Sequence, residues 1–401
     1  MVLYRSSQIF YLARDMFSMS KRLDSIANSA TMQMKERVNA VKASGVKLAD
    51  LTVGEPDFPT PELVKQAAIE AINKNLTYYT SASGIPDLRN ELSQFLKSHN
   101  KIDASLVGPD NVLVTPGAKQ GLFYVLASLL NEGDEVIIPE PCWVSYGDIT
   151  KLNGGATVFV QSSEKSSFIP SISDIRFAMT RRTRAILINN PVNPTGAFYE
   201  KEYIRELVEL CEERGIPLIS DEIYSDIMFD DNKFYSAMET KSQSVILLSG
   251  LSKTAAMTGW RLGYIVAENK LIRDCVKMQQ QTATCPSSIT QYAAIAALRN
   301  YENYFPKMLI EYKKRRRMLV DGIRNIPKFS CFEPKGAFYV FMNVSKLGVS
   351  SEEATSLLLE KAHVASVSGS AFGKSGEGYV RLSFATSEEN IELALSNLTG
   401  I

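Results

Sequence analysis

The stretch VILLSGLSKTAAMTGWRLGYIVA, residues 245–267, contains two apolar runs separated by a loop of small and polar residues. The runs VILLSG and GYIVA are short and apolar, as buried β-strands are. Lys253 lies in the loop after the first run, among Ser, Gly and Ala. Lysine is usually a solvated surface residue. A lysine that follows a buried strand, with neighbours too small to fill the space around it, indicates a site that leaves room for a ligand.

Strand-like and helix-like segments alternate over the preceding part of the chain, from about residue 111. Amphipathic segments such as EKEYIRELVELCEERG (200–215) separate the short apolar runs. This alternation predicts an α/β fold with a mostly parallel sheet that is covered by helices on both faces. Such sheets bind ligands beyond the carboxyl ends of their strands. The strand-like runs are NVLVT, DEVIIP, TVFVQ, RAILINN and PLISDEIY.

The pattern changes after about residue 270, where long helical segments lead to the short strands FYVFMNV (338–344) and YVRLSFAT (379–386). The final part of the chain is therefore predicted to be a smaller α+β domain. The first residues are too interrupted by Arg5 and Arg14 for a secretory signal. The predicted organisation is an N-terminal extension (1–19), an N-terminal segment of the small domain (20–50), a large domain (51–285), and a C-terminal small domain that begins with a long linking helix (286–401).

Composition excludes several classes of function. The 44 basic and 44 acidic residues of the 401-residue chain give no electrostatic signature for nucleic acid or an anionic membrane. The basic run KKRRR (313–317) falls in a helical segment and is interpreted as a solvated face. No apolar run approaches the roughly 20 residues of a membrane span. The five cysteines lack metal-ligand spacing and only two histidines occur, so we expect a cytoplasmic protein without a metal site or a Ser-His-Asp triad.

Polar residues also follow other predicted strands. In VTPGAKQG (114–121) a strand passes through a Pro-Gly turn into a helix. There the backbone N–H groups of Gly117, Ala118 and Lys119 would face an anion, although a simple tight turn explains the pattern equally well.

Two further segments have both a structural and a functional interpretation. NNPVNPTG (189–196) is either a turn or a rigid support that holds Asn193 toward a ligand. SDEIY (220–224) places Asp221 and Tyr224 after a buried strand, where acids are commonly functional or helix-capping.

Together these residues are what pyridoxal phosphate requires. The cofactor needs a desolvated lysine for its aldehyde, which Lys253 supplies, and a carboxylate for its ring nitrogen, which Asp221 supplies. Its ring hydroxyl needs donors, its phosphate needs a cationic pocket, and its ring needs a flat surface. These are supplied by Tyr224 with Asn193, by Arg261 with the 117–119 turn, and by Trp143.

The sequence resembles the class I aminotransferases of fold type I. The resemblance covers residues 20–400 in order, and it is strongest to the prokaryotic aspartate and aromatic aminotransferases. It predicts a large domain with a mostly parallel seven-stranded sheet and a smaller α+β domain. The matching motifs are VGEPDFPTP (53–61), YTSASGIPDLR (79–89), PCWVSY (141–146), NPTG (193–196), SDEIY (220–224), SGLSKTAAMTGWRLGY (249–264), GAFYVF (336–341) and VRLSFATS (380–387).

The resemblance implies a role for each matching residue. Lys253 would bind the cofactor covalently and move a proton at the substrate Cα, and Asp221 would keep the ring nitrogen protonated. Tyr79 would reach the phosphate in the other subunit, which implies a homodimer with shared sites. The remaining cofactor-binding residues are Gly117, Ala118, Lys119, Trp143, Asn193, Tyr224, Ser252 and Arg261, and the substrate-binding residues are Gly54, Trp143, Asn193 and Arg381.

The implied reaction is transfer of an amino group from an L-amino acid, with aspartate expected first, to a 2-oxo acid such as 2-oxoglutarate. The alternatives are an aromatic or alanine-type aminotransferase, another fold type I enzyme such as a lyase, and, in a different class, a catalytically inactive regulatory domain of aminotransferase ancestry.

The sequence departs from its relatives at two places. Gly250 stands where many relatives have a phosphate-binding serine, and Ser249 or Ser252 could replace it. The segment 277–288 has no arginine for a distal substrate carboxylate, which leaves Lys119, hydroxyls near Thr31 or Thr284, or water as candidates. The loop around Thr31 is expected to close over the substrate.

Overall fold

The computed structural model describes residues 23, 24, 26 and 30–401, so the predicted N-terminal extension (1–19) lies outside it. Helices and strands alternate through the middle of the chain. The helices are α1 (Ala30–Ala43), α2 (Glu62–Asn73), α3 (Pro86–Ser98), α4 (Ala118–Leu129), α5 (Ser145–Leu152), α6 (Ile172–Ala178), α7 (Lys201–Arg214), α8 (Asn269–Thr282), α9 (Ser288–Arg299), α10 (Tyr301–Arg324), α11 (Ser351–Lys361) and α12 (Glu388–Leu398). The strands are β1 (Ala49–Asp50), β2 (Val112–Thr115), β3 (Glu135–Glu140), β4 (Ala156–Gln161), β5 (Thr183–Asn189), β6 (Leu218–Asp221), β7 (Val245–Gly250), β8 (Gly263–Val266), β9 (Ser330–Cys331), β10 (Tyr339–Asn343), β11 (Val364–Ala365), β12 (Val367–Ser368) and β13 (Tyr379–Ser383).

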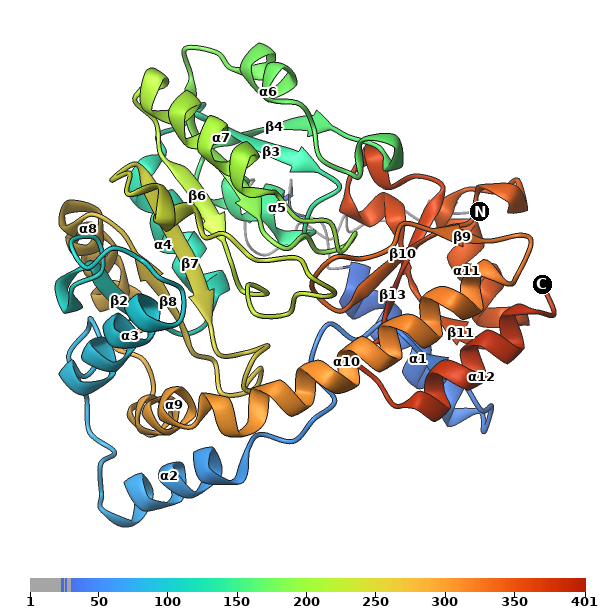
Figure 1. Cartoon of the computed structure of the whole chain (residues 1–401), viewed down its shortest axis with the longest axis horizontal. Helices are drawn as coiled ribbons and strands as arrows, with labels where there is room; N and C mark the ends of the chain where they lie inside the picture. Colours follow the sequence, from blue (N-terminus) through green and yellow to red (C-terminus); the bar gives the residue numbers. More distant parts are fainter. Residues whose placement is uncertain (1–22, 25, 27–29) are drawn as a thin grey trace, which may run out of the picture.

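The large sheet has seven strands in the order β2-β8-β7-β6-β5-β3-β4. All neighbouring pairs are parallel except those of β8, which runs antiparallel to both β2 and β7. The predicted seven-stranded, mostly parallel sheet is therefore confirmed. Its helices lie on both faces (Figure 1).

Residue alternation along each strand explains this layering. In β7, Val245 and Leu247 pack on one face, in the cluster that includes α3, α7 and α9. Ile246 and Leu248 pack on the other, with α4, α5 and α8. Because successive side chains of a strand point to opposite faces, a run of continuous apolar residues requires a cover on both sides.

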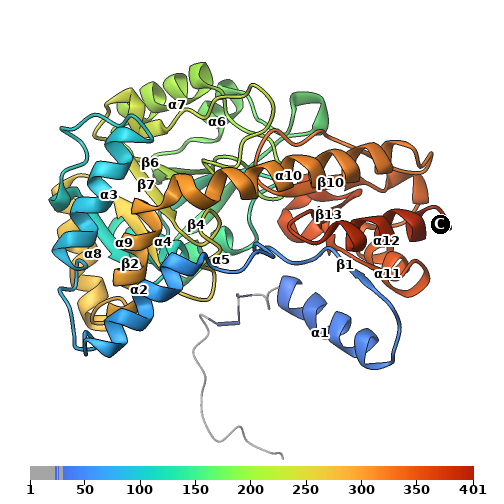
Figure 2. The same cartoon turned by 60° about the horizontal axis from the view of Figure 1, so that its bottom comes forward.

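A second, smaller part of the molecule is built around the antiparallel sheet β12-β13-β10-β9. Strand β1 lies near the start of the described chain and pairs in parallel with β11, which lies near its end. The N-terminal segment therefore packs with this smaller part. Helix α10 extends from the large sheet to this part (Figure 2). The boundary between residues 285 and 286 stays a prediction, and α9, which follows it, contacts α2 and α3. In the described part of the chain, no helix has the length and apolarity that crossing a membrane requires.

Candidate active site

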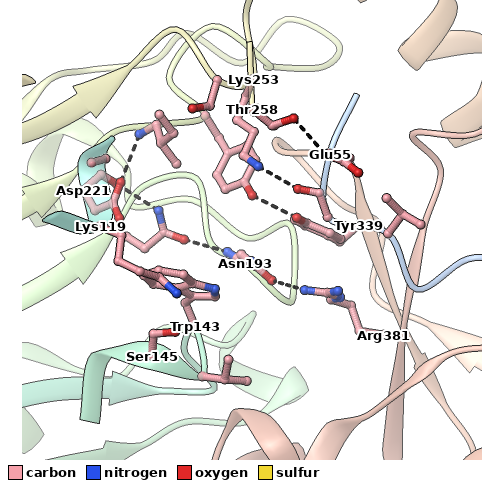
Figure 3. Close-up of a pocket in the computed structure, with 18 of the residues that line it drawn as sticks. Glu55, Lys119, Trp143, Ser145, Asn193, Asp221, Lys253, Thr258, Tyr339 and Arg381 are labelled. Carbon is pink, nitrogen blue, oxygen red and sulfur yellow. Dashed lines mark hydrogen bonds between the residues drawn. The ribbon is translucent and has the colours of Figure 1, made fainter. Parts of the chain in front are cut away.

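A cavity of about 520 Å³ lies where the carboxyl ends of the central strands face the smaller part. The large part contributes residues that follow β3, β5, β6 and β7, and the smaller part contributes Tyr339 from β10 and Arg381 from β13 (Figure 3). Most of the predicted site residues meet here. Those that line the cavity are Gly54, Ala118, Lys119, Trp143, Asn193, Asp221, Tyr224, Ser252, Lys253, Arg261 and Arg381.

Lys253 follows β7 and projects its amine into the cavity. Its Nζ donates a hydrogen bond to the carbonyl oxygen of Gly54 at 2.6 Å. Burial lowers the pKa of Lys253 to about 8, against the opposing effect of the Glu55 carboxylate. A lysine pKa this low leaves a usable fraction of neutral, nucleophilic amine near neutral pH.

Asp221 ends β6 and is buried, with 7% of its surface exposed. Its carboxylate accepts hydrogen bonds from the Tyr146 hydroxyl at 2.7 Å and the Ile223 amide at 3.2 Å. Burial nevertheless raises the pKa of Asp221 to about 6. A desolvated carboxylate with these partners favours a cationic N–H group nearby.

Residues 117–119, where the sequence predicts an anion site, lie at the start of α4. Gly117 has a φ of 92°, and a Cβ at this position would collide with the guanidinium of Arg261. Gly117 therefore does not line the cavity itself but lets Arg261 approach the helix N-terminus. The Gly117 N–H donates to the Thr115 carbonyl oxygen at 2.7 Å, so it is not available as predicted. The N–H groups of Ala118 and Lys119, together with the Arg261 guanidinium, are of the kind that binds a phosphate.

The structure explains the glycine at position 250. A Cβ there would lie 2.8 Å from the carbonyl oxygen of Leu262 and 3.0 Å from the Cα of Gly263, so β8 leaves no room for serine. Of the two candidate replacements, Ser252 lines the cavity. Ser249 instead donates to the carbonyl oxygen of Glu222 at 3.3 Å.

Arg381 crosses from β13 to the large part and is only 2% exposed. Its guanidinium donates to the Asn193 side-chain oxygen at 3.0 Å and to the Thr52 carbonyl oxygen at 2.9 Å. The Nε atom is buried without a hydrogen-bond partner. Asn193 is held in turn by Asn189, whose side-chain oxygen accepts from the Asn193 amide at 2.8 Å.

Lys119 and Trp143 form the opposite wall (Figure 3). The Lys119 Nζ lies 4.8 Å from the centre of the Trp143 ring. Burial and the nearby Arg261 lower the pKa of Lys119. Of the other candidates for a distal carboxylate, Thr284 is exposed and does not line the cavity, and the side chain of Thr31 lies outside the described residues.

Tyr79, like Gly117, is a predicted site residue that does not line the cavity of its own chain. Its side chain is 86% exposed, beside the equally exposed Tyr78. An aromatic pair with this exposure suits a contact with another chain.

Several residues of the site were not predicted from the sequence, among them Tyr146, Tyr339 and Glu55. Tyr146 bonds to Asp221, and the hydroxyls of Tyr339 and Tyr224 lie 2.9 Å apart. The Glu55 carboxylate accepts from the Thr258 hydroxyl at 2.7 Å. Tyr146, Tyr339 and Glu55 all fall within motifs that matched the family, so the motifs were the available signal.

The chain matches the family model for class I and II aminotransferases over residues 46–398. It is 38% identical over 383 residues, which cover 94% of this chain and 97% of the relative, to an aspartate aminotransferase of Pyrococcus horikoshii. It is 36% identical to aromatic-amino-acid aminotransferase 2 of Thermococcus litoralis, covering 95% of this chain and 97% of that one. The solved structure of Thermus thermophilus aspartate aminotransferase with maleate superposes with a TM-score of 0.92 at 36% identity, covering 96% of this chain and 100% of that chain.

Proposed function

The chain belongs to the family of class I and II aminotransferases, and we propose that it transfers the amino group of L-aspartate to 2-oxoglutarate with pyridoxal phosphate as its cofactor. The observation that carries this proposal is the meeting of Lys253, Asp221 and Arg381 in one cavity. These are a nucleophilic amine, a buried carboxylate and a buried guanidinium. The reaction needs one of each.

The residues of the cavity fit this cofactor. The N-terminus of α4 and Arg261 would hold the phosphate, with Ser252 beside them. Trp143 offers a flat surface for the ring, and Tyr224 with Asn193 would donate to the ring hydroxyl. Burial raises the pKa of Tyr224, so its hydroxyl remains protonated and able to donate.

Pyridoxal phosphate, when bound, withdraws electrons from the substrate Cα and makes its proton acidic. Lys253 would bind the cofactor aldehyde and then carry the proton that leaves Cα, since its lowered pKa suits both tasks. Asp221 would hold a proton at the ring nitrogen, because its buried carboxylate gains a cationic partner there.

Arg381 would bind the α-carboxylate of every substrate. A guanidinium presents a planar pair of N–H groups that matches a carboxylate in two parallel hydrogen bonds. Its side chain comes from the smaller part and Lys253 from the large part, so substrate would lie between the two.

The preference for an acidic amino acid is supported by Lys119 and by Lys35 of α1, which both line the cavity. The side-chain carboxylate of aspartate or glutamate would be attracted to these two ammonium groups. The Thermococcus relative named for aromatic amino acids makes an aromatic preference the competing outcome.

A kcat/KM panel tests the substrate. With 2-oxoglutarate as acceptor, we expect aspartate to exceed tyrosine, phenylalanine, alanine and methionine. Glutamate is measured with oxaloacetate as acceptor, because with 2-oxoglutarate its donor and product would be the same pair. If both aspartate and glutamate fall more than about a hundredfold below the best neutral amino acid (~2.7 kcal/mol), the acidic assignment is wrong and aminotransferase activity stands.

Borohydride reduction of the holoenzyme tests the cofactor. A phosphopyridoxyl group is expected on the peptide that contains Lys253, and labelling of Lys119 instead would contradict the site assignment. Maleate, the ligand named for the Thermus thermophilus relative, is an unreactive dicarboxylate whose binding can be measured without turnover.

We also propose a cytoplasmic homodimer whose partner supplies Tyr79. Mixing Tyr79→Phe chains with Lys253→Ala chains should produce heterodimers that have one intact site. Absence of activity in verified heterodimers would exclude the shared site.

A further inference from the structure

The basic run at residues 313–317 is only in part the solvated face that its composition predicted, because Lys313, Lys314 and Arg317 are exposed but the two residues between them are not. Arg315 and Arg316 are buried, with 8% and 3% of their surface exposed, because they share the face of α10 that includes Tyr312 and Leu319. A buried guanidinium is costly unless it is paired. Both arginines are paired, and the partner of Arg315 lies close to the active site.

Arg315 holds two consecutive residues of the segment that follows β1. Its Nη1 donates to the Asp57 carboxylate at 2.7 Å. Its Cζ lies 5.0 Å from the centre of the Phe58 ring, which meets Tyr312 edge-on at 5.4 Å. Helix α10 therefore fixes this end of the segment by both charge and packing.

Residues 52–55 of the segment 52–57 form one wall of the cavity, and Pro56 and Asp57 lie just outside it. The carbonyl oxygen of Thr52 accepts a hydrogen bond from Arg381, and that of Gly54 accepts one from Lys253. The segment has no regular secondary structure, since β1 ends at Asp50 and α2 begins at Glu62. Its position accordingly depends on its contacts with other parts of the chain.

Those contacts differ in whether the reaction uses them. Lys253 and Arg381 line the cavity and would bind cofactor and substrate, so their bonds to the segment share groups with the reaction. Arg315 and Asp57 do not line the cavity, and their ion pair is free to persist.

Space around the segment is narrow. A Cβ on Gly54 would lie 3.0 Å from the Tyr339 hydroxyl and 4.0 Å from Arg381 Nη2. A displacement of about 1 Å, a scale on which bound groups lose their productive geometry, would therefore disturb Arg381 and the carboxylate that it binds.

We propose that Arg315 is a positioning residue for substrate binding, which acts through Asp57 to hold the 52–57 segment beside Arg381. This inference rests on the proposed aminotransferase function. Arg315 contacts neither cofactor nor substrate, so its loss alters the binding of carboxylates more than the turnover of bound substrate.

The test compares the Arg315→Met and Asp57→Asn holoenzymes with the unchanged protein. We expect KM for aspartate and 2-oxoglutarate, and the Kd for maleate from calorimetry, to rise at least tenfold, while kcat stays within threefold. The Arg315→Met/Asp57→Asn double variant should bind maleate as well as the single variant with the higher Kd does. Both substitutions remove the same ion pair, so their effects should not add. Asp57→Asn preserves the size of the side chain, so it tests the proposal on its own if Arg315→Met does not fold.

Two variants on the same helix are the controls. Arg317→Met changes an exposed residue and should leave KM, Kd and Tm unchanged. Arg316→Met removes an equally buried arginine that pairs with Asp230 at 2.8 Å, and should lower Tm while KM stays within threefold. The inference is overturned if Arg315→Met lowers only Tm, or if Arg316→Met raises KM as much. If the protein without substitutions neither catalyses transamination nor binds maleate, the proposed function is overturned, and the inference with it.

Discussion

Replacing Arg381 by methionine should weaken the enzyme's use of every amino acid by the same factor. The α-carboxylate is common to all these substrates, and Arg381 is the cavity-lining arginine supplied by the smaller part. Methionine preserves much of the length of the side chain and removes its charge and its N–H groups.

The magnitude follows from the surroundings of the guanidinium. Arg381 is 2% exposed, so a bound carboxylate would interact with it away from water. Two of its N–H groups already bond to Asn193 and Thr52, which limits the net gain on binding substrate. A desolvated pair of this kind contributes roughly 2–5 kcal/mol. That corresponds to a loss of about 30-fold to 5,000-fold in kcat/KM.

The assay measures kcat/KM for aspartate, glutamate, tyrosine and alanine in Arg381→Met and Arg381→Lys. The ratios between substrates should stay within threefold in both variants. Lysine retains the charge but not the paired donors, so its loss should be intermediate. A loss below tenfold, or one confined to aspartate and glutamate, would refute the reasoning, since the second result would place Arg381 at the side-chain carboxylate.

Three other changes have defined outcomes. Asp221→Ala should retain the fold but lower kcat by at least a hundredfold (~2.7 kcal/mol), and near-normal turnover would exclude its role. The rate at which pyridoxal phosphate labels cofactor-free protein at Lys253 should rise with pH, because only the neutral amine reacts. The midpoint of this rise should lie near the lowered pKa of about 8, and a midpoint near the pKa of free lysine would contradict the effect of burial. Gly250→Ser should lower Tm by separating β7 from β8, and an unchanged Tm would show that the strands can adjust.

Much of the sheet could be predicted because its signal is local. Runs such as Val245–Gly250 are apolar at every position, which predicts burial on both faces before any partner is known. Lys253, Asp221 and Asn193 were found for a related reason. Each ends or follows a buried strand, and the carboxyl ends of parallel strands meet at one edge of a sheet.

The features that could not be predicted depend on pairs of residues far apart in the chain. Nothing near Tyr146 in the sequence indicates that it bonds to Asp221. The basic run on α10 has the composition of a solvated face, and only the packing of the helix shows which two arginines turn inward. The choice between Ser249 and Ser252 likewise depends on the direction of a side chain at the end of β7.

The pairing of β1 with β11 sets the order in which the protein can be completed during synthesis. Ala49 emerges from the ribosome early, but its partner Val364 is among the last residues to be made. The last strand of the large sheet to be synthesised is β8, which ends at Val266. The large sheet can therefore assemble while α1 and β1 still lack their partners from the C-terminal part of the chain. A nascent chain that stalls before β13 would therefore possess Lys253 and Asp221 without Arg381. Such an unfinished chain would have the residues for the cofactor before it could hold a substrate.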